Sequence, residues 1–427
     1  KQNSIGNTTI IDLYLACRLS KRNIEQFRAM NNVASALNVP VSRITFAGIK
    51  DKKACTEQDM VIALSMSISL SSDKEVLREQ MKECVQSRVS QLRNLGRPGM
   101  NVREYRIVEK PLQLGQLLGN EFVIKLRGLQ SSQEAGIVEE RFQWLVENGF
   151  PNFYGPQRFT TCAAQEEEEK ISSGHHNTSL SAQMGRWLIA GDFRQVLKAF
   201  LSQRFLRSDS SDLQFHLSQM FEGKISTRET LDRIVNSNGN AQLEEVTILR
   251  AMIRFGAEFT DQKKNALEFK SAIEQTIPYH MRELLKNAYQ SWLWNRSVCD
   301  RLKESTMAIP GDLCSDEKIK GDVRILQQED CDAEGGHQLS IVMPLKGKKV
   351  MFPTHALGKR YEESDMRVNQ LMPGAYRSCK ARVLNSKVMQ TVLEDDNSVS
   401  IILQFTLPPG SYATSVIREL CRNNHIM

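Results

Sequence analysis

Apolar side chains recur at every second position over residues 9–18, a period that is typical of a half-buried strand. An irregular apolar stripe at helical spacing begins at Asn23 and Gln26, which resemble a capping box, and stops at Pro40; this predicts a helix. A short apolar run over residues 44–46 then leads into a glycine. The first part of the chain is therefore predicted to run strand, helix, strand and loop.

The two periods continue to alternate up to residue 148. Residues 60–70 are apolar and suit a strand, whereas residues 72–94 form an amphipathic helical pattern. Residues 122–126 alternate again after a Gly-Asn turn, and residues 136–148 return to helical spacing. This part of the chain is therefore expected to mix strands and helices.

The middle of the chain is mostly helical, and the C-terminal part returns to strands. Ser411 is placed to cap a last helix that runs to Leu420, and the N-terminus of that helix is suited to hold a phosphate. Helical spacing covers residues 184–190, 193–205, 231–235, 243–255 and 281–302, with loops at 208–212 and 236–240. Strands and turns are expected over residues 309–353, a short charged helix over 360–367 and a strand over 399–405.

Length and composition are those of a globular protein with more than one domain. The 427 residues exceed one ordinary core, so about two or three domains are expected. Hydrophobic residues make up 41% and charged residues 25%, as is usual for a globular chain. No apolar run is long enough for a membrane span. The chain starts at Lys1 rather than a methionine, which suggests a fragment or a processed form.

Charge and cysteine usage narrow the partners and the compartment. The net charge of +6 permits nucleic-acid binding without requiring it. The nine cysteines are scattered without a C-x-x-C pair, as in reduced intracellular proteins. We therefore expect the nucleus, the cytoplasm or both, with an organelle as a further option. Cys314, Cys331, His337 and His355 fit no zinc-site spacing, so no metal site is expected.

The stretch best suited to chemistry is residues 46–58, FAGIKDKKACTEQ. Gly48 permits a sharp or left-handed turn at the end of a strand. Asp51 follows among lysines, which favour its ionised form and attract phosphates. Taken alone, an aspartate in a basic turn is usually a surface residue. Further candidates for phosphate contacts, which more often form a solvated edge, are Arg18, Lys21 and Arg22.

Two motifs change that interpretation. Residues 47–58 contain A-G-x-K-D-K-x-A-x-T-x-Q, which resembles the catalytic motif of the TruD family of pseudouridine synthases. Residues 112–122 contain L-x-L-G-x-L-x-G-N-x-F, which is similar to the family's second active-site segment. By pattern alone, Asn120 would be a turn residue and Phe122 a core aromatic. The resemblance instead implies that Asn120 orients Asp51 and that Phe122 stacks on the target base.

Two further segments follow in the order of the family. Residues 149–159, GFPNFYGPQRF, closely match its N-Y-F-G-x-Q-R-F segment, whereas Thr160 replaces the glycine that normally comes next. A polar insertion is expected to form a solvated loop through Ser179. Residues 405–420 match the closing motif almost unchanged.

Residues 287–295, NAYQSWLWN, resemble the signature helix of the domain that is inserted into TruD-like synthases. Three aromatic side chains lie in this segment, and the apolar character of the helix favours core packing over RNA contact. These side chains are Tyr289, Trp292 and Trp294.

The resemblance covers nearly the whole chain and implies an α/β (α+β) fold. A catalytic core on a mixed, mainly antiparallel sheet is expected, with a large, mostly helical α/β domain inserted into it. The predicted domains are residues 1–160 for the first part of the core, with its N-terminal segment missing, residues 161–374 for the insertion, and residues 375–427 for the closing strand and helix of the core.

The implied activity is isomerisation of uridine to pseudouridine in RNA, without metal or organic cofactor. Asp51 is the essential carboxylate, which either adds to the ribose C1′ or removes the 2′ proton. The implied partner is tRNA, with mRNA as a second candidate, and the protein is expected to be a monomer that does not bind membranes. The expected RNA contacts are Lys50, Lys52, Lys53, Arg158, Phe159 and a basic patch of Lys346, Lys348 and Lys349.

Two other functions stay open at this point. The family carries an active-site lysine upstream of the first strand, and this chain begins after it. An RNA-binding protein or folding chaperone that keeps the cleft is therefore the main alternative, and the chain as given is expected to bind RNA but turn it over slowly or not at all. A glycosidase is disfavoured, because only Glu57 and Asp59 accompany Asp51 in the motif.

Overall fold

The chain forms two compact units, Lys1–Asn120 and Glu121–Met427. The domain boundaries predicted at residues 160 and 374 both lie within the second unit, and they stay a prediction. The polar insertion expected after Thr160 lies outside the described residues up to residue 178. This computed structural model describes residues 4–5, 8–69, 74–159, 179–205, 211–238, 244–260, 266–315, 323–333, 339–396 and 398–421.

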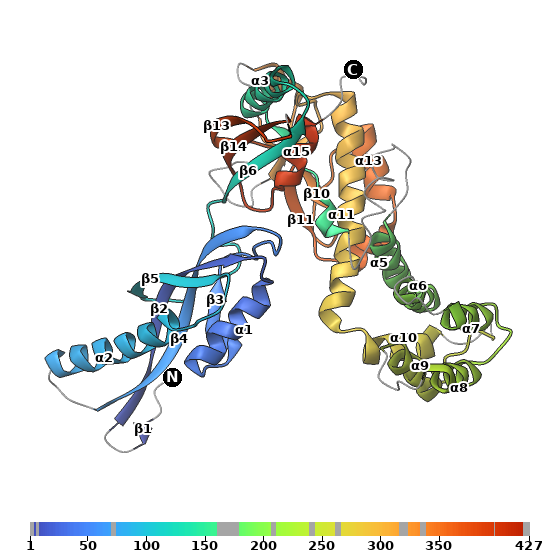
Figure 1. Ribbon diagram of the computed structural model, residues 1–427. Helices are drawn as coiled ribbons and strands as arrows, with labels where there is room; N and C mark the ends of the chain where they lie inside the picture. Colours follow the sequence, from blue (N-terminus) through green and yellow to red (C-terminus); the bar gives the residue numbers. More distant parts are fainter. Residues whose placement is uncertain are drawn as a thin grey trace. The chain divides into compact units, whose positions relative to one another are not determined.

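The first unit is built on a five-stranded sheet (Figure 1). Its two longest strands run antiparallel along their whole length, from Thr8 opposite Ser69 to Arg22 opposite Cys55. The predicted order of strand, helix, strand and loop is confirmed. The strands follow the order β1 (Ser4–Ile5), β2 (Thr8–Arg22), β4 (Cys55–Ser69) and β3 (Ile44–Phe46), and β5 (Met100–Val108) pairs with β2.

One face of this sheet is apolar and is covered by α1 (Gln26–Leu37) and α2 (Lys74–Arg93). Every second residue of β2 from Leu13 to Leu19 is buried there, and each such side chain contributes roughly 1.5–3 kcal/mol. The N-cap of α1 is Glu25, whose carboxylate accepts a hydrogen bond from the backbone N of Arg28 at 2.8 Å. The capping box predicted for Asn23 and Gln26 is therefore wrong.

The second unit contains a three-stranded sheet in the order β13 (Leu384–Leu393), β14 (Val399–Leu407) and β6 (Asn120–Leu129). Two helices, α3 (Ser132–Asn148) and α15 (Ala413–Leu420), share its core. Segments that are far apart in the sequence therefore form one packed layer. The predicted capping role of Ser411 is wrong, because α15 has no side-chain cap and the Ser411 hydroxyl donates to Oδ1 of Asn152 at 3.0 Å.

A four-stranded sheet and the long helix α11 (Tyr279–Glu304) form the next layer. Trp294 of α11 is fully buried and donates from Nε1 to the carbonyl of Met343 at 3.0 Å. Core packing is thus confirmed for Trp294, and also for Tyr289. The strands are β11 (Ala375–Ser378), β10 (Ile341–Leu345), β8 (Leu313–Ser315) and β9 (Val323–Ile325), and a separate pair joins β7 (Phe150–Pro151) to β12 (Lys380–Ala381).

Among the described residues, the helical part of the second unit contains a cluster of five helices, two of which the sequence did not predict. A cluster of helices encloses one apolar core: α6 (Phe193–Phe205), α7 (Ser211–Phe221), α8 (Thr227–Asn238), α9 (Glu244–Phe255) and α10 (Ala266–Thr276). Of these, α7 and α10 were missed. The single charged helix expected over residues 360–367 is two helices, α13 (Ala356–Glu363) and α14 (Met366–Leu371), which are separated at Asp365 with its φ of 36°.

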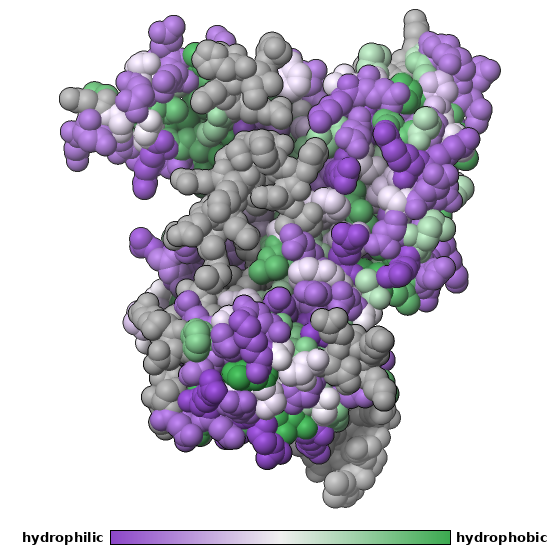
Figure 2. Space-filling view, turned by 90° about the vertical axis from the view of Figure 1, so that its right-hand side faces the viewer, coloured by the Kyte–Doolittle hydropathy of each residue, from purple (hydrophilic) through white to green (hydrophobic). Residues whose placement is uncertain are grey.

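The pairs β2–β4, β2–β5, β10–β11 and β13–β14 all run antiparallel, as expected for the core sheet. Among the described helices, none combines the length and the apolar character needed to cross a membrane. Figure 2 shows one face of the molecule, on which hydrophilic residues predominate and hydrophobic ones gather in small groups.

Candidate active site

The loop that carries Asp51 connects β3 to β4 and leaves this residue exposed. The segment before Asn120 fixes the start of the loop, because the backbone N of Gly115 donates to the carbonyl of Ala47 at 2.8 Å. Of the sharp or left-handed turn that Gly48 was expected to permit, the left-handed form is absent, because its φ lies outside the left-handed region, whereas the chain bends sharply at residues 47–48. An added Cβ would only touch Leu117 at 3.7 Å. The loop that follows β3 therefore presents Asp51 to solvent.

The ammonium of Lys21 binds the backbone carbonyls of Lys50 and Asp51. Its Nζ donates to the carbonyl of Asp51 at 2.6 Å and to the carbonyl of Lys50 at 3.3 Å. The side chain is only 3% exposed. Burial lowers the pKa of Lys21, and the charge of the Asp51 carboxylate acts in the opposite direction. Lys21 therefore neither belongs to a solvated edge nor is free to contact a phosphate, the two roles weighed for it, and its ammonium instead holds the loop.

A second contact joins the two predicted catalytic segments. The Nζ of Lys50 donates a hydrogen bond to Oδ1 of Asn120. Burial lowers the pKa of the half-buried Lys50, again opposed by the charge of Asp51. Asn120 thus contacts the neighbour of the predicted catalytic residue. The ammonium of Lys50, expected on a phosphate, lies against this amide, whereas Lys52 and Lys53 are exposed as their predicted role requires.

The other acids of the motif are held in ion pairs on the polar face of the sheet. Asp59 accepts from Arg18 at 3.1 Å and from Arg106 at 2.8 Å. Burial alone would raise the pKa of Asp59, but these hydrogen bonds hold it below its usual value. A hydrogen bond from Ser20, together with Arg103, lowers the pKa of Glu57. Since a glycosidase needs a carboxyl group that stays protonated, neither residue suits that role.

Phe122 lies on β6, half-buried against the core of the three-stranded sheet. Its ring stacks on that of Phe405, with centroids 5.7 Å apart and planes inclined by 29°. The ring therefore packs partly in the core, as the pattern of the strand indicated. Stacking on a base stays a prediction for the part of the ring that is exposed.

Asn152 of the third motif is held by Arg377, which the sequence did not single out, and by Ser411 of the closing motif. Arg377 donates from Nη2 to the carbonyl of Asn152 at 2.8 Å and to its Oδ1 at 2.9 Å. The guanidinium lies 4.1 Å from the centre of the Tyr154 ring. Asn152 also accepts from Ser411. Gly155 permits this approach, because an added Cβ would lie 2.8 Å from Oγ1 of Thr414.

Arg158 and Phe159, both predicted to contact RNA, are half-buried. The Nε of Arg158 donates to Oγ of Ser291 at 3.1 Å, and its guanidinium lies 5.5 Å from the centre of the Tyr154 ring. Phe159 packs against the core beneath α11. RNA contact by Arg158 and Phe159 stays a prediction, and only the exposed parts of the two side chains can take part in it.

Of the three lysines that were expected to form a basic patch, Lys346 does not reach the surface. Lys346 is 0% exposed, and its Nζ donates to the carbonyls of Tyr361 at 2.7 Å and Glu362 at 3.0 Å. These carbonyls end α13, so Lys346 caps that helix. Its predicted contact with RNA is wrong. Lys348 and Lys349 are exposed.

Within the part of the chain that the structure describes, no group of His, Cys, Asp and Glu side chains could hold a metal ion. His355, one of the residues weighed for zinc, lies 3.2 Å from Oδ1 of Asp312 through its Nε2 and accepts from the backbone N of Gly358. His337 lies outside the described residues.

Comparison with known proteins identifies the family of the chain. The family model of tRNA pseudouridine synthase D (TruD) matches residues 2–420. The chain belongs to the TruD family. It is 27% identical to pseudouridylate synthase PUS7L of Danio rerio over 96% of the chain and 62% of that relative. It is 26% identical to PUS7L of Homo sapiens, with 96% and 57% covered. The chain thus spans only about 60% of the length of such relatives.

An archaeal relative is covered more completely. The probable tRNA pseudouridine synthase D of Methanococcoides burtonii is 23% identical over 95% of the chain and 87% of its own length. The crystal structure of the putative tRNA pseudouridine synthase D from Methanosarcina mazei superposes with a TM-score of 0.61 at 18% identity, covering 95% of this chain and 87% of the other. The expected α+β pseudouridine synthase fold is confirmed.

Proposed function

We propose that this TruD-family protein isomerises uridine to pseudouridine in RNA, with tRNA as the first substrate to test and mRNA as the second. The observation that carries the proposal is the Asp51 loop. An exposed carboxylate follows a sheet edge, and Lys21 and the Lys50–Asn120 contact restrain the backbone beside it. Names of relatives that refer to tRNA, and to several substrates in Schizosaccharomyces pombe, support the substrate class.

In the proposed reaction, the bond between N1 of uracil and C1′ of the ribose breaks, and the uracil turns while it stays bound. A bond then forms between C5 and C1′, and the proton on C5 is transferred to N1. Asp51 either adds to C1′ or removes the 2′ proton, and in both cases it must be an ionised carboxylate at the start. A fixed backbone serves either route, because a reacting group gains most when its position is set in advance.

Asp51→Asn tests this assignment. The amide keeps the shape of the side chain and removes its charge, so pseudouridine formation is expected to fall by at least about a hundredfold, while the RNA dissociation constant changes only a few fold. Both are measured on tRNA transcripts, by mapping pseudouridine at single-nucleotide resolution and by titrating labelled RNA.

Asp396→Asn is the matched control, because this acid belongs to a turn after β13, far along the chain from the motif. Undiminished turnover by Asp51→Asn would falsify the assignment. Binding by the parent protein without any pseudouridine would instead favour an RNA-binding protein or chaperone.

We also propose an intracellular location and a monomeric state. Cys17, Cys55, Cys84, Cys299, Cys331, Cys379 and Cys421 are free thiols, which suits a reducing compartment. Exposed Lys52 and Lys53 in the loop, with Lys348 and Lys349, supply positive charge for phosphates.

A further inference from the structure

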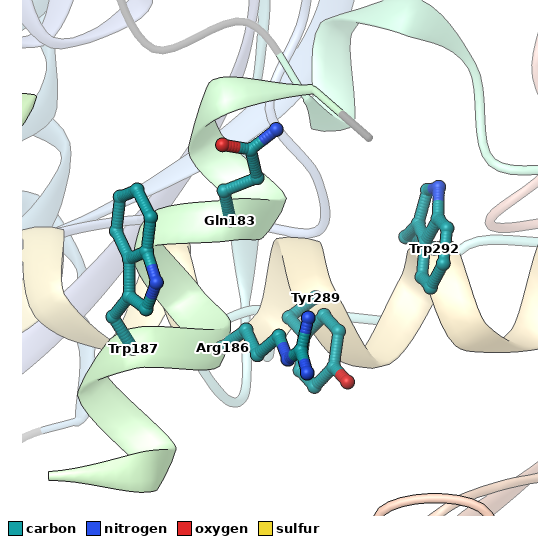
Figure 3. A pocket seen from close by; sticks show the side chains of 5 residues that line it. All are labelled: Gln183, Arg186, Trp187, Tyr289 and Trp292. Atoms are coloured by element: carbon teal, nitrogen blue, oxygen red, sulfur yellow. The ribbon is translucent and has the colours of Figure 1, made fainter. Parts of the chain in front are cut away.

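A pocket opens between α5 (Leu180–Ala190) and α11, both in the second unit. Its volume is about 180 Å³. A cavity of about 150 Å³ accommodates a benzene ring, so the pocket has room for the ring of one pyrimidine. Figure 3 shows Gln183 and Trp187 on α5, Trp292 on α11, and Arg186 and Tyr289 between them.

Two tightly packed helices fix these side chains. Gln183, Arg186 and Trp187 lie three and four positions apart on α5, as do Tyr289, Trp292 and Arg296 on α11, so each set shares one helix face. Gly185 sets the distance between the helices, because an added Cβ would lie only 2.0 Å from the carbonyl oxygen of Leu285. The pocket is therefore preformed.

Aromatic surface and positive charge occur together at this pocket. The rings of Tyr289 and Trp292 are stacked, with centroids 6.1 Å apart and planes inclined by 14°. The guanidinium of Arg296 lies 5.7 Å from the centre of the Trp292 ring, and Arg186 is exposed. The nearby carboxylate of Asp365 accepts a hydrogen bond from the Tyr289 hydroxyl at 2.9 Å. Trp292 itself is only half-buried, unlike Trp294.

We propose that this pocket binds one unpaired base of the RNA substrate. The base stacks on Trp292, and Arg186 and Arg296 contact the adjoining phosphates. Aromatic rings beside arginines are how proteins hold single-stranded RNA. Among the residues that the structure describes, none that lines the pocket carries a carboxylate to attack the ribose, so we expect the bound base to be recognised and not chemically changed. The choice of RNA as ligand rests on the proposed function.

The test compares binding of two probes to the Asp51→Asn protein, in which no turnover interferes. One probe is a 12-nucleotide uridine oligomer, and the other is an abasic oligomer of equal length. Trp292→Ala is expected to weaken binding of the uridine oligomer roughly 5- to 150-fold and to leave binding of the abasic oligomer unchanged. Trp292→Phe, which keeps a ring, is expected to retain most of the affinity.

Trp144→Ala is the matched control, because Trp144 is 59% exposed on α3 and does not line the pocket. It is expected to leave both affinities unchanged. The proposal is overturned if Trp292→Ala changes uridine-oligomer binding by less than twofold, or if it weakens both probes equally, which would indicate a general loss of structure.

Turnover separates this proposal from the proposed function. With Asp51 intact, Trp292→Ala is expected to raise KM for RNA by the same factor and to leave kcat within about twofold. If the parent protein makes no pseudouridine but still prefers the uridine oligomer through Trp292, the pocket stands and the proposed function fails. If turnover is normal and Trp292→Ala leaves KM unchanged, only the pocket is overturned.

Discussion

At the scale of single residues, two lysines have roles opposite to those that their charge suggested. Lys346 was expected to contact RNA, and Lys21 to belong to a solvated edge or to contact a phosphate, yet both are buried and donate to backbone carbonyls. The alternation of β2 contains a signal for Lys21, since it continues the buried series of Leu15, Cys17 and Leu19. Its partner carbonyl, however, comes from another element, and no local pattern identifies that contact.

The two hydrogen bonds from Lys21 to the Asp51 loop lead to a prediction about catalysis. Lys21→Met keeps the length of the buried stem but removes the two hydrogen bonds to the loop. We expect kcat for pseudouridine formation to fall at least about tenfold, because a displaced reacting group loses much of its advantage, while KM stays within a few fold.

Lys52→Met is the control for the Lys21 experiment, because Lys52 is exposed in the same loop. It is expected to raise KM and to leave kcat nearly unchanged, since it removes a phosphate contact only. If the two substitutions had equal effects on KM and on kcat, the proposed difference between Lys21, which positions the loop, and Lys52, which contacts a phosphate, would be contradicted.

At the scale of elements, strong alternation was predicted correctly and weak helical patterns were not. The strands β2 and β14 bury mainly every second residue, and their sequences show this alternation, whereas β4 was predicted from an apolar run. Helix α7 begins in a Ser-Asp run that reads as a loop, and its burial comes from neighbouring helices. The motifs indicated Asp51 and Asn120, whereas the Lys50–Asn120 contact depends on tertiary packing.

The close packing of α5 against α11 leads to a prediction about stability. Gly185→Ala places a methyl group against the backbone of Leu285, so we expect the free energy of unfolding to fall by about 1–3 kcal/mol. Denaturant titration measures this change. Gly136→Ala in α3 meets no atom within 4 Å and is expected to stabilise by about 0.5–1 kcal/mol. Stabilisation by both would show that the helices can move apart at no cost.

At the scale of the whole molecule, the family motifs established the fold class but not the division of the chain. The motif segments lie in both compact units, and the unit boundary falls directly after Asn120, inside the second motif. The sequence places a Gly-Asn turn at this point, but such a turn occurs within domains as well and does not identify a boundary between units. The second unit also contains a buried ammonium group, that of Lys346, which affects the stability of the molecule.

The buried Lys346 is expected to make the free energy of unfolding depend on pH. Burial lowers its pKa from 10.5 to about 8. Between these values the unfolded chain binds more protons at this position than the folded chain, so the contribution of Lys346 to stability rises with pH. The free energy of unfolding of the wild type, measured relative to Lys346→Met, is therefore expected to increase from pH 7.5 to 10.

The comparison with Lys346→Met removes the opposing effect of buried thiols. Burial raises the pKa of Cys17 and of Cys379 to about 12, and these groups weaken the folded state as pH rises. They are present in both proteins and cancel in the difference. A difference that stays flat or shrinks over this range would show that the Lys346 ammonium is not held in a buried site.

The long pairing of β2 with β4 also bears on the order in which the first unit folds. The pair Arg22–Cys55 joins residues much closer in sequence than the pair Thr8–Ser69. Each doubling of a closed loop costs only about 0.6 kcal/mol in chain entropy, so the preference is small but has a definite direction. We expect the hairpin to nucleate at its inner end and to zip outward, so that the end beside Asp51 forms before the remote end.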